Sequence, residues 1–209
     1  VFQDSGRGFG DPMLRDLLEL SERPDVISLS LGLPAPDLLP LKIFGRVQEA
    51  LLDEVGPALL LHSPTEGITP FRESLVSLAA ARGIHCTVGE VLVVSGSQQG
   101  LHLLSRVLLS AGDTVVVEEP TFFGALQVFR AAGARVVGVP VDGTGMRTDV
   151  LEALLQRHRP KLIYTLPTFQ NPSGAVMSLA RRRHLLDLAR RHQVPIVEDD
   201  PYSELRYEG

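Results

Sequence analysis

The sequence predicts an α/β fold in three layers, in which a mostly parallel β-sheet is flanked by helices. Three observations lead to this prediction. The 209 residues are 44% hydrophobic, which is enough to bury a substantial core. Short runs of β-branched residues recur from residue 91 onward, and stretches with helical periodicity separate them. Such alternation requires crossover connections between the strands, and crossovers produce parallel neighbours.

The part of the chain before about residue 90 has a different pattern, so we expect a change of organisation there. Helices are expected from about Asp11 to Glu22, Leu41 to Glu54 and Pro70 to Arg82. Pro70 suits a first helical turn, where its missing N–H has no intrahelical acceptor. A Gly- and Pro-rich segment, Leu31 to Pro40, separates the first two helices.

The second part supplies the expected sheet and the helices around it. Strands are expected at residues 91–95, 114–119, 135–139, 161–166 and 194–199. Helices are expected at residues 98–110, 122–132, 149–159 and 178–192. Parallel sheets bind ligands at the carboxyl ends of their strands, so the residues that follow each strand are the candidates for a functional site.

Composition limits the class of partner and the compartment. The formal net charge is -5 and the isoelectric point is near 5.7, so nucleic acid is an unexpected direct ligand. Cys86 is the one cysteine and cannot form an intrachain disulfide. No apolar run is long enough for a membrane span and the first residues do not resemble a signal peptide, so a cytoplasmic location is expected.

Two sequence strings at expected strand ends are suited to a phosphorylated, ring-containing ligand. SGSQQG at 95–100 follows the first strand and begins a helix, so Ser97 would offer a hydroxyl and backbone N–H groups to an anion. An ordinary helix cap is the alternative for this serine. EEPTFFG at 118–124 places Phe122 and Phe123 where a flat ligand could stack, and a role in the core is the alternative.

Two further strings follow the last two expected strands. PTFQNPSG at 167–174 predicts a rigid loop that presents the Asn171 amide to a ligand oxygen, although a simple Asn-Pro turn is also compatible. EDDPYSELRY at 198–207 places three consecutive acids after an apolar strand, and such acids need partners if they are buried. No histidine pair has zinc spacing, so an organic cation is favoured over a metal.

The strings SGSQQG, FQNPSG and EDDPY, in this order, resemble those of the class I/II aminotransferases of pyridoxal 5'-phosphate (PLP) fold type I. The similarity is strongest to the group with 2-aminoadipate and kynurenine aminotransferases, and to the aminotransferase-like domains of MocR-type regulators. The resemblance runs from Pro24 to Tyr207. It implies an N-terminal helical arm and part of a small domain at residues 1–60, and a partial PLP-binding large domain at 61–209.

The resemblance also implies the residue roles. Ser97 and Gln98 would hold the phosphate, Phe122 would stack on the pyridine ring, and Asn171 and Tyr202 would bind the phenolic oxygen. Asp199 would pair with the protonated ring nitrogen, and Asp199 and Tyr202 would be the catalytic residues of this segment. Gly32 and Asn171 would lie beside the substrate carboxylate. His62 stands where relatives have a tyrosine that reaches the phosphate of the partner subunit, so a homodimer is expected.

Besides His62, three features depart from the family pattern. Phe122 stands where tyrosine is common, and Leu31 where glycine is common. The lysine that binds PLP covalently lies beyond the DDPY segment in relatives, and neither Lys42 nor Lys161, the two lysines of the chain, is a suitable substitute. Arg181, Arg182 and Arg183 are expected to form a solvated helix face rather than to bind the substrate carboxylate. The chain alone is therefore expected to be inactive.

Two functions follow from the resemblance. The first is an aminotransferase that passes an amino group from an L-amino acid to PLP and then to a 2-oxo acid. The second is a PLP-sensing aminotransferase-like domain of a transcription regulator. A downstream lysine would support the enzyme, and a winged-helix domain before this segment would support the regulator.

Overall fold

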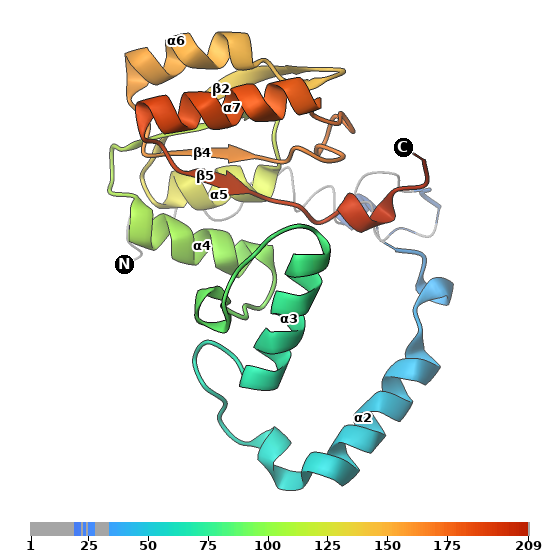
Figure 1. Cartoon of the computed structure of the whole chain (residues 1–209). Helices are drawn as coiled ribbons and strands as arrows, with labels where there is room; N and C mark the ends of the chain where they lie inside the picture. Colours follow the sequence, from blue (N-terminus) through green and yellow to red (C-terminus); the bar gives the residue numbers. More distant parts are fainter. Residues whose placement is uncertain (1–18, 22, 24, 28–33, 209) are drawn as a thin grey trace, which may run out of the picture. The chain divides into compact units, whose positions relative to one another are not determined.

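The computed structural model describes residues 19–21, 23, 25–27 and 34–208 (Figure 1). The described residues fall into two compact units, one that ends at Val93 and one that begins at Val94. This division lies close to the change of pattern near residue 90. The division at residues 60 and 61 rests on family resemblance and stays a prediction.

The first unit is helical. It contains η2 (Pro36–Leu38), α2 (Leu41–Val55), η3 (Gly56–Leu60), α3 (Thr69–Ala81) and η4 (Val88–Glu90). The helices expected at 41–54 and 70–82 are thus confirmed, and Pro70 lies in the first turn of α3. Of the helix expected at 11–22, only residues 19–21 are described, and they are helical.

The PTEG segment at 64–67 is held against the residues that end this unit. The Val93 amide donates to the Glu66 carbonyl oxygen at 3.0 Å. Gly67 has a φ of +99°, and a Cβ there would lie 2.5 Å from Cγ2 of Val93. Arg72 of α3 donates to the carbonyl oxygens of Val88 and Val91. These contacts fix the loop that follows His62 within its own unit.

The second unit is the α/β sheet domain. Its helices are α4 (Ser97–Leu108), α5 (Phe123–Ala131), α6 (Thr148–His158), α7 (Leu179–His192) and the short η5 (Ser203–Leu205). Its strands are β1 (Thr114–Glu119), β2 (Arg135–Asp142), β3 (Gly145–Met146), β4 (Leu162–Thr165) and β5 (Ile196–Glu198).

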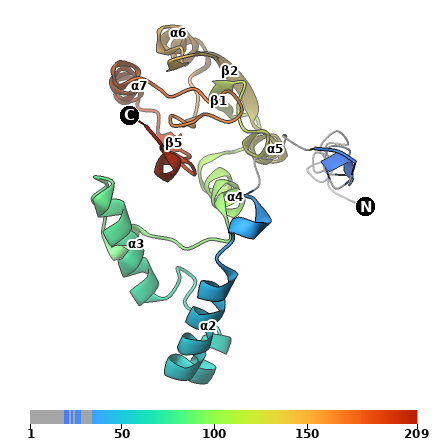
Figure 2. The same ribbon diagram turned by 90° about the vertical axis from the view of Figure 1, so that its right-hand side faces the viewer.

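The sheet has the strand order β3-β2-β1-β4-β5 and is parallel except at the β2–β3 hairpin. Alternate residues of each strand face opposite sides. Val116 and Ile163 pack with residues of α6 and α7, whereas Val115 and Leu162 pack with residues of α4 and α5. Figures 1 and 2 show these helix pairs on opposite sides of the strands, so the predicted three-layer α/β fold is confirmed.

Two details of the sheet differ from the sequence prediction. Residues 91–95 do not form a strand, because in the described part of the chain no strand pairs with them; their one backbone bond to another segment joins Val93 to Glu66. The period of apolar residues can identify an extended segment, but it cannot show whether another strand lies beside that segment to pair with it. The short antiparallel β3 was not predicted, since two residues are too few to show a period.

The chain connections place a topological switch at β1. The chain passes from β1 through α5 to β2 on one side, and later returns through α6 to β4 on the other side of β1. Crossovers that leave in opposite directions open a crevice beyond the carboxyl ends of the two strands. The carboxyl ends of β1 and β4 therefore mark the expected ligand site.

Candidate functional site

The SGSQQG segment turns into α4 at Gly96, whose φ of +84° favours glycine. Ser97 begins the helix and is exposed, and the N–H groups of a first helical turn have no intrahelical acceptors. The side chain of Gln98 is already engaged, since its Nε2 donates to the Gly124 carbonyl oxygen at 2.9 Å. Of the two residues predicted to hold phosphate, Ser97 therefore offers a side chain and Gln98 offers its backbone N–H.

Phe122 forms the N-cap of α5 and is half-buried against the core on the α4 and α5 side. Its ring covers Gly124: a Cβ at this glycine would lie 2.6 Å from Cε1 of Phe122 and 2.7 Å from Oε1 of Gln98. The rings of Phe122 and Phe123 are tilted by 57° with centroids 5.1 Å apart. Phe122 thus belongs partly to the core and partly to the edge of the candidate site.

Glu118, at the end of β1, is a buried carboxylate that sequence reasoning did not single out. It accepts hydrogen bonds from Thr165 Oγ1 at 2.7 Å, from the Leu166 amide at 3.1 Å and from Gln170 Nε2 at 3.2 Å. Burial raises the pKa of Glu118, and these donors oppose the rise only in part. The signal that could have identified it is an acid at the end of an apolar β-run.

Gln170 joins the loop after β4 to the loop after β1. Its Nε2 donates to the Pro120 carbonyl oxygen at 2.7 Å, and its Oε1 accepts from the backbone N–H of Ser173 at 2.9 Å. The peptide bonds that precede Pro120 and Pro172 are both cis. A fully enclosed glutamine therefore holds the segment that carries Asn171.

The arginines at 181–183 correct one expectation. Arg181 donates to both carboxylate oxygens of Asp142 and to the Gly145 carbonyl oxygen, which ties α7 to the β2–β3 hairpin. Arg182 donates to the carbonyl oxygens of Pro167 and Met177 at 2.7 and 2.9 Å. The prediction of a solvated face was wrong for these two residues, and Arg183 alone is exposed. All of these acceptors lie outside α7, so helical position alone could not reveal them.

Asp199 lies directly after β5 and is half-buried, while the preceding Glu198 is exposed. Its amide donates to the Thr165 carbonyl oxygen, and its Oδ2 accepts a hydrogen bond from the Tyr164 hydroxyl at 2.8 Å. No described residue donates to its Oδ1. Nearby, Nδ2 of Asn171 lies 3.4 Å from the hydroxyl oxygen of Tyr202, which is a long hydrogen bond.

Six of the eight predicted site residues therefore lie in the second unit, in loops after its strands or at the start of α4. They are Ser97, Gln98, Phe122, Asn171, Asp199 and Tyr202. His62 is exposed and belongs to the first unit, and Gly32 and Leu31 lie outside the described residues. The roles of all eight as ligand-binding residues stay predictions.

The loops at this edge have features of a ligand site. Oγ1 of Thr121 and Oγ of Ser203 are buried and have no hydrogen-bond partner among the described residues. A hollow of about 550 Å³, lined mostly by apolar side chains, adjoins Tyr202 and includes Phe169 and Leu205. Among the described residues, no group of three His, Cys, Asp or Glu side chains could hold a metal ion.

The parallel sheet, its switch point and the polar groups at its carboxyl edge define an α/β protein with a small-molecule site at that edge. The chain belongs to the aminotransferase class I and II family, whose model matches residues 24–209.

Individual relatives agree with this assignment. Aromatic-amino-acid aminotransferase 1 of Thermococcus litoralis is 41% identical over 214 residues, which cover 100% of this chain and 51% of that protein. The solved structure of LysN, the alpha-aminoadipate aminotransferase of Thermus thermophilus, complexed with N-(5'-phosphopyridoxyl)-L-leucine, superposes with a TM-score of 0.88. It is 36% identical, and the match covers 100% of this chain and 51% of that one.

A third relative is described as a regulator. The uncharacterized HTH-type transcriptional regulator YisV of Bacillus subtilis is 34% identical over 188 residues, which cover 89% of this chain and 38% of that protein. The chain thus spans about half the length of the aminotransferases it matches, and less of the regulator.

Proposed function

We propose that the protein containing this chain is a PLP-dependent aminotransferase, which transfers an amino group between an L-amino acid and a 2-oxo acid. The observation that carries the proposal is the position of Asp199. It is a half-buried carboxylate at the carboxyl edge of the sheet, with one oxygen held by Tyr164 and the other without a donor in the described structure. Family membership supplies the reaction class.

The residues at this edge fit PLP. The N-terminus of α4 offers Ser97 and backbone N–H groups to the phosphate, and such helix ends favour anions. Phe122 offers an aromatic face, and Asn171 and Tyr202 offer an amide and a hydroxyl to the phenolic oxygen. The hydroxyls of Thr121 and Ser203, which have no partner among the described residues, agree with a polar ligand in these loops.

PLP, when bound, supplies an electron sink for negative charge at the α-carbon of the amino acid. The contribution of Asp199 is to keep a proton on the ring nitrogen. At a separation of about 4 Å and an effective dielectric constant near 20, two opposite charges attract by roughly 4 kcal/mol, before desolvation is subtracted. Gly32 and Asn171 remain the proposed neighbours of the substrate carboxylate.

The lysine that binds the cofactor is proposed to come from a part of the protein outside these 209 residues. Lys161 immediately precedes β4 and is exposed, and its amide donates to the Thr114 carbonyl oxygen at the amino end of β1. It thus lies at the edge of the sheet opposite to Asp199. Lys42 lies on α2 in the other unit and is exposed.

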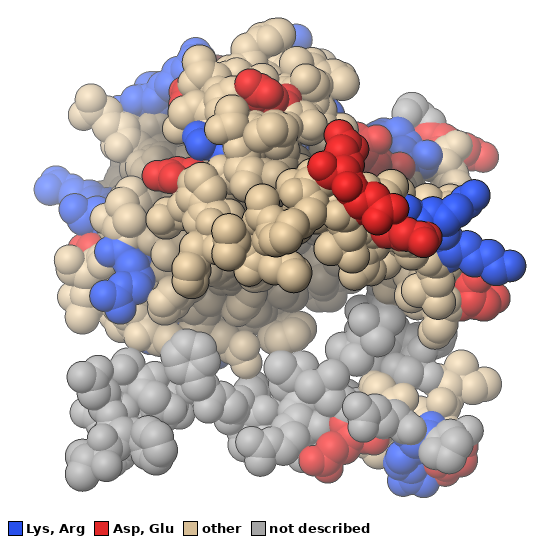
Figure 3. Space-filling view, turned by 90° about the horizontal axis from the view of Figure 1, so that it is seen from below, with Lys and Arg blue, Asp and Glu red and all other residues tan. Residues whose placement is uncertain are grey.

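A homodimer with His62 directed to the partner's cofactor phosphate is part of the same proposal. The first unit exposes several large apolar side chains, including Phe44 and Val47 of α2, and such surfaces usually mark contacts with another part of a protein. On the face in Figure 3, acidic and basic side chains lie in small groups around a largely uncharged surface.

Light scattering should report a dimer of the full-length protein, and His62→Ala should weaken PLP binding by about 1.5 to 3 kcal/mol. A stable, active monomer would contradict the dimer.

A regulatory domain is the second candidate, and the similarity to YisV is the observation that favours it. A DNA-binding domain in the complete reading frame would identify the protein as such a regulator.

No helix among the described residues is long and apolar enough to cross a membrane. The cytoplasmic location stays a prediction.

Substitution of Asp199 in the full-length protein tests the proposed function. Asp199→Ala should lower the rate of transamination by orders of magnitude, since the ring nitrogen then lacks its counter-charge. Glu198→Ala is the matched control, because this exposed neighbour lies one residue earlier and should leave the rate nearly unchanged. Near-normal turnover by Asp199→Ala would show that the residue has another role.

A further inference from the structure

Tyr164 is a fully buried phenol on an inner strand of the sheet, and the sequence pattern gave it no role. It is a β4 residue with 0% of its surface exposed. Its ring meets the ring of Phe129 edge-on, with centroids 5.6 Å apart and planes at 72°. A buried hydroxyl needs a hydrogen-bond partner, and the partner of this one is Oδ2 of Asp199, at 2.8 Å.

The direction of this hydrogen bond is fixed by the surroundings of the phenol. Burial, followed by the negative charge of Asp199 and the hydrogen bond to it, raises the pKa of Tyr164 far above its usual range. The charges of Glu118 and Tyr202 act on this pKa in the same direction. Tyr164 therefore stays protonated and donates, while Asp199 accepts.

The same contact restricts the carboxylate of Asp199. Its backbone is fixed by the bond from its amide to Thr165, and its Oδ2 by the bond from Tyr164. Tyr164 itself cannot shift readily, because it is enclosed in the core between β-strands and α5. Only Oδ1 is without a donor from the described residues.

We propose that Tyr164 is a positioning residue for the cofactor: its buried hydroxyl holds Oδ2 of Asp199 and leaves Oδ1 available to the ring nitrogen of PLP. The inference rests on the proposed function, because it presupposes that Asp199 meets that nitrogen. It predicts that the loss of the hydroxyl acts on the cofactor through the ring nitrogen alone.

The test compares two cofactors in the full-length apoprotein. One is PLP, and the other is 1-deazapyridoxal 5'-phosphate, in which a C–H group replaces the ring nitrogen. Tyr164→Phe should raise the dissociation constant of PLP by about tenfold, the effect of one hydrogen bond to a charged group. The dissociation constant of the deaza analogue should stay unchanged, because it has no ring nitrogen for Asp199 to meet.

Two controls separate positioning from packing. Phe129→Leu disturbs the contact with the same ring but leaves the hydroxyl in place, so it should change the affinities for both cofactors by the same factor. In an Asp199→Ala background, Tyr164→Phe should have no further effect on PLP binding. If Tyr164→Phe weakens both cofactors equally, or neither, Tyr164 is a structural residue and the inference is wrong.

The outcome for the unmodified protein tests the proposed function separately. If it fails to bind PLP, the proposed function fails whatever Tyr164 does. If it binds PLP and the deaza analogue equally well, Asp199 does not meet the ring nitrogen and the inference falls with that assignment. A preference for PLP that Tyr164→Phe reduces by about tenfold supports both.

Discussion

Glu118 illustrates how a single residue can support a site without contacting its ligand. Its carboxylate joins the end of β1 to the end of β4 and to Gln170 in the loop that carries Asn171. The sequence presents it as one of two adjacent acids after an apolar run. Glu118 is buried while Glu119 is exposed, although residues on both faces of β1 are buried. Local pattern could not show which acid is enclosed, because the three donors to Glu118 lie about fifty positions later in the chain.

The buried charge of Glu118 should make stability depend on pH. Its pKa is raised above the ordinary value of 4.5, so the folded protein retains this proton over a range in which the unfolded chain has lost it. The contribution of Glu118 to the free energy of unfolding is therefore fully present below 4.5 and declines as pH rises through the raised pKa. Glu118→Gln imitates the protonated form and should be more stable than the unmodified protein at neutral pH and equally stable in acid.

Urea unfolding of both proteins across this pH range measures the difference. Glu118→Ala is the comparison variant, since it removes the acceptor of three hydrogen bonds. Its free energy of unfolding should fall by roughly 1 to 3 kcal/mol for each donor that neither water nor another acceptor satisfies. An advantage of the glutamine variant that grows as pH falls would contradict the assignment of a raised pKa.

At the scale of elements, the local sequence pattern was sufficient to predict a helix or strand wherever its apolar residues recur with a regular period. The two long helices of the first unit and the four helices of the second unit lie within a few residues of their predicted bounds, because apolar residues recur on one face of each. Four of five expected strands are present for the same kind of reason. The run at 91–95 failed because a strand also needs a neighbour, and local sequence carries no information about that neighbour.

Arg182 of α7 is expected to stabilise the loop that carries Asn171, and substitution of this arginine tests that role. Arg182 donates to carbonyl oxygens of Pro167 and Met177, which bracket the loop with Asn171. Arg182→Ala should reduce the free energy of unfolding by roughly 1 to 3 kcal/mol, since partly buried acceptors lose a charged donor. It should also speed amide hydrogen exchange in residues 168–176. Arg183→Ala, at the exposed neighbour, should change stability by less than about 0.5 kcal/mol. Equal effects of the two substitutions would contradict this role of Arg182.

At the scale of the whole molecule, the sequence motifs predicted which residues gather at the sheet edge but not the contacts that hold them there. Asp199 and Asn171 were selected because their strings follow expected strands, and parallel strands bring such ends together. Tyr164 and Gln170 were missed because their partners lie 35 and about 50 positions away in the sequence. His62 belongs to the other unit, so its role depends on contacts outside the second unit.

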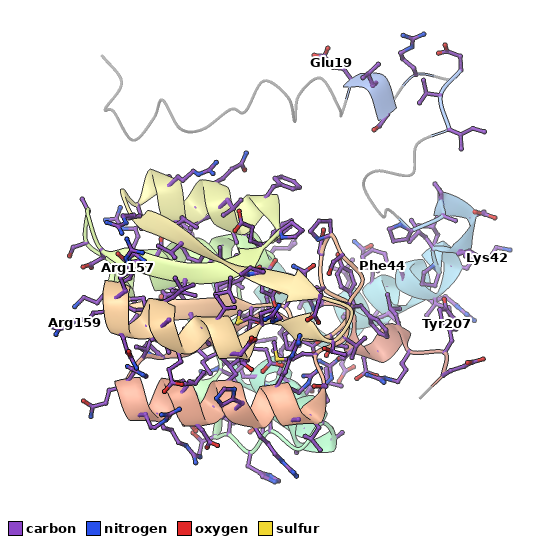
Figure 4. All side chains as sticks on the ribbon, turned by 90° about the horizontal axis from the view of Figure 1, so that it is seen from above. Glu19, Lys42, Phe44, Arg157, Arg159 and Tyr207 are labelled. Atoms are coloured by element: carbon purple, nitrogen blue, oxygen red, sulfur yellow. The ribbon has the colours of Figure 1, made fainter. Side chains whose placement is uncertain are left out.

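The positions of the two lysines lead to a prediction for the 209-residue chain itself. Covalent attachment of PLP requires an amine near the site of its phosphate and ring, at the carboxyl edge of the sheet. Lys161 is at the amino edge, and Lys42 extends from α2 (Figure 4). The chain should therefore not transaminate, and borohydride reduction after brief exposure to low PLP should label Lys42, Lys161 and the terminal amine slowly and to similar extents. Peptide mapping by mass spectrometry measures each site. If Lys161 is labelled rapidly and stoichiometrically, and an amino acid prevents this labelling, Lys161 lies in the active site. That result would contradict its assignment to the amino edge of the sheet. It would also contradict the need for a lysine from elsewhere in the protein.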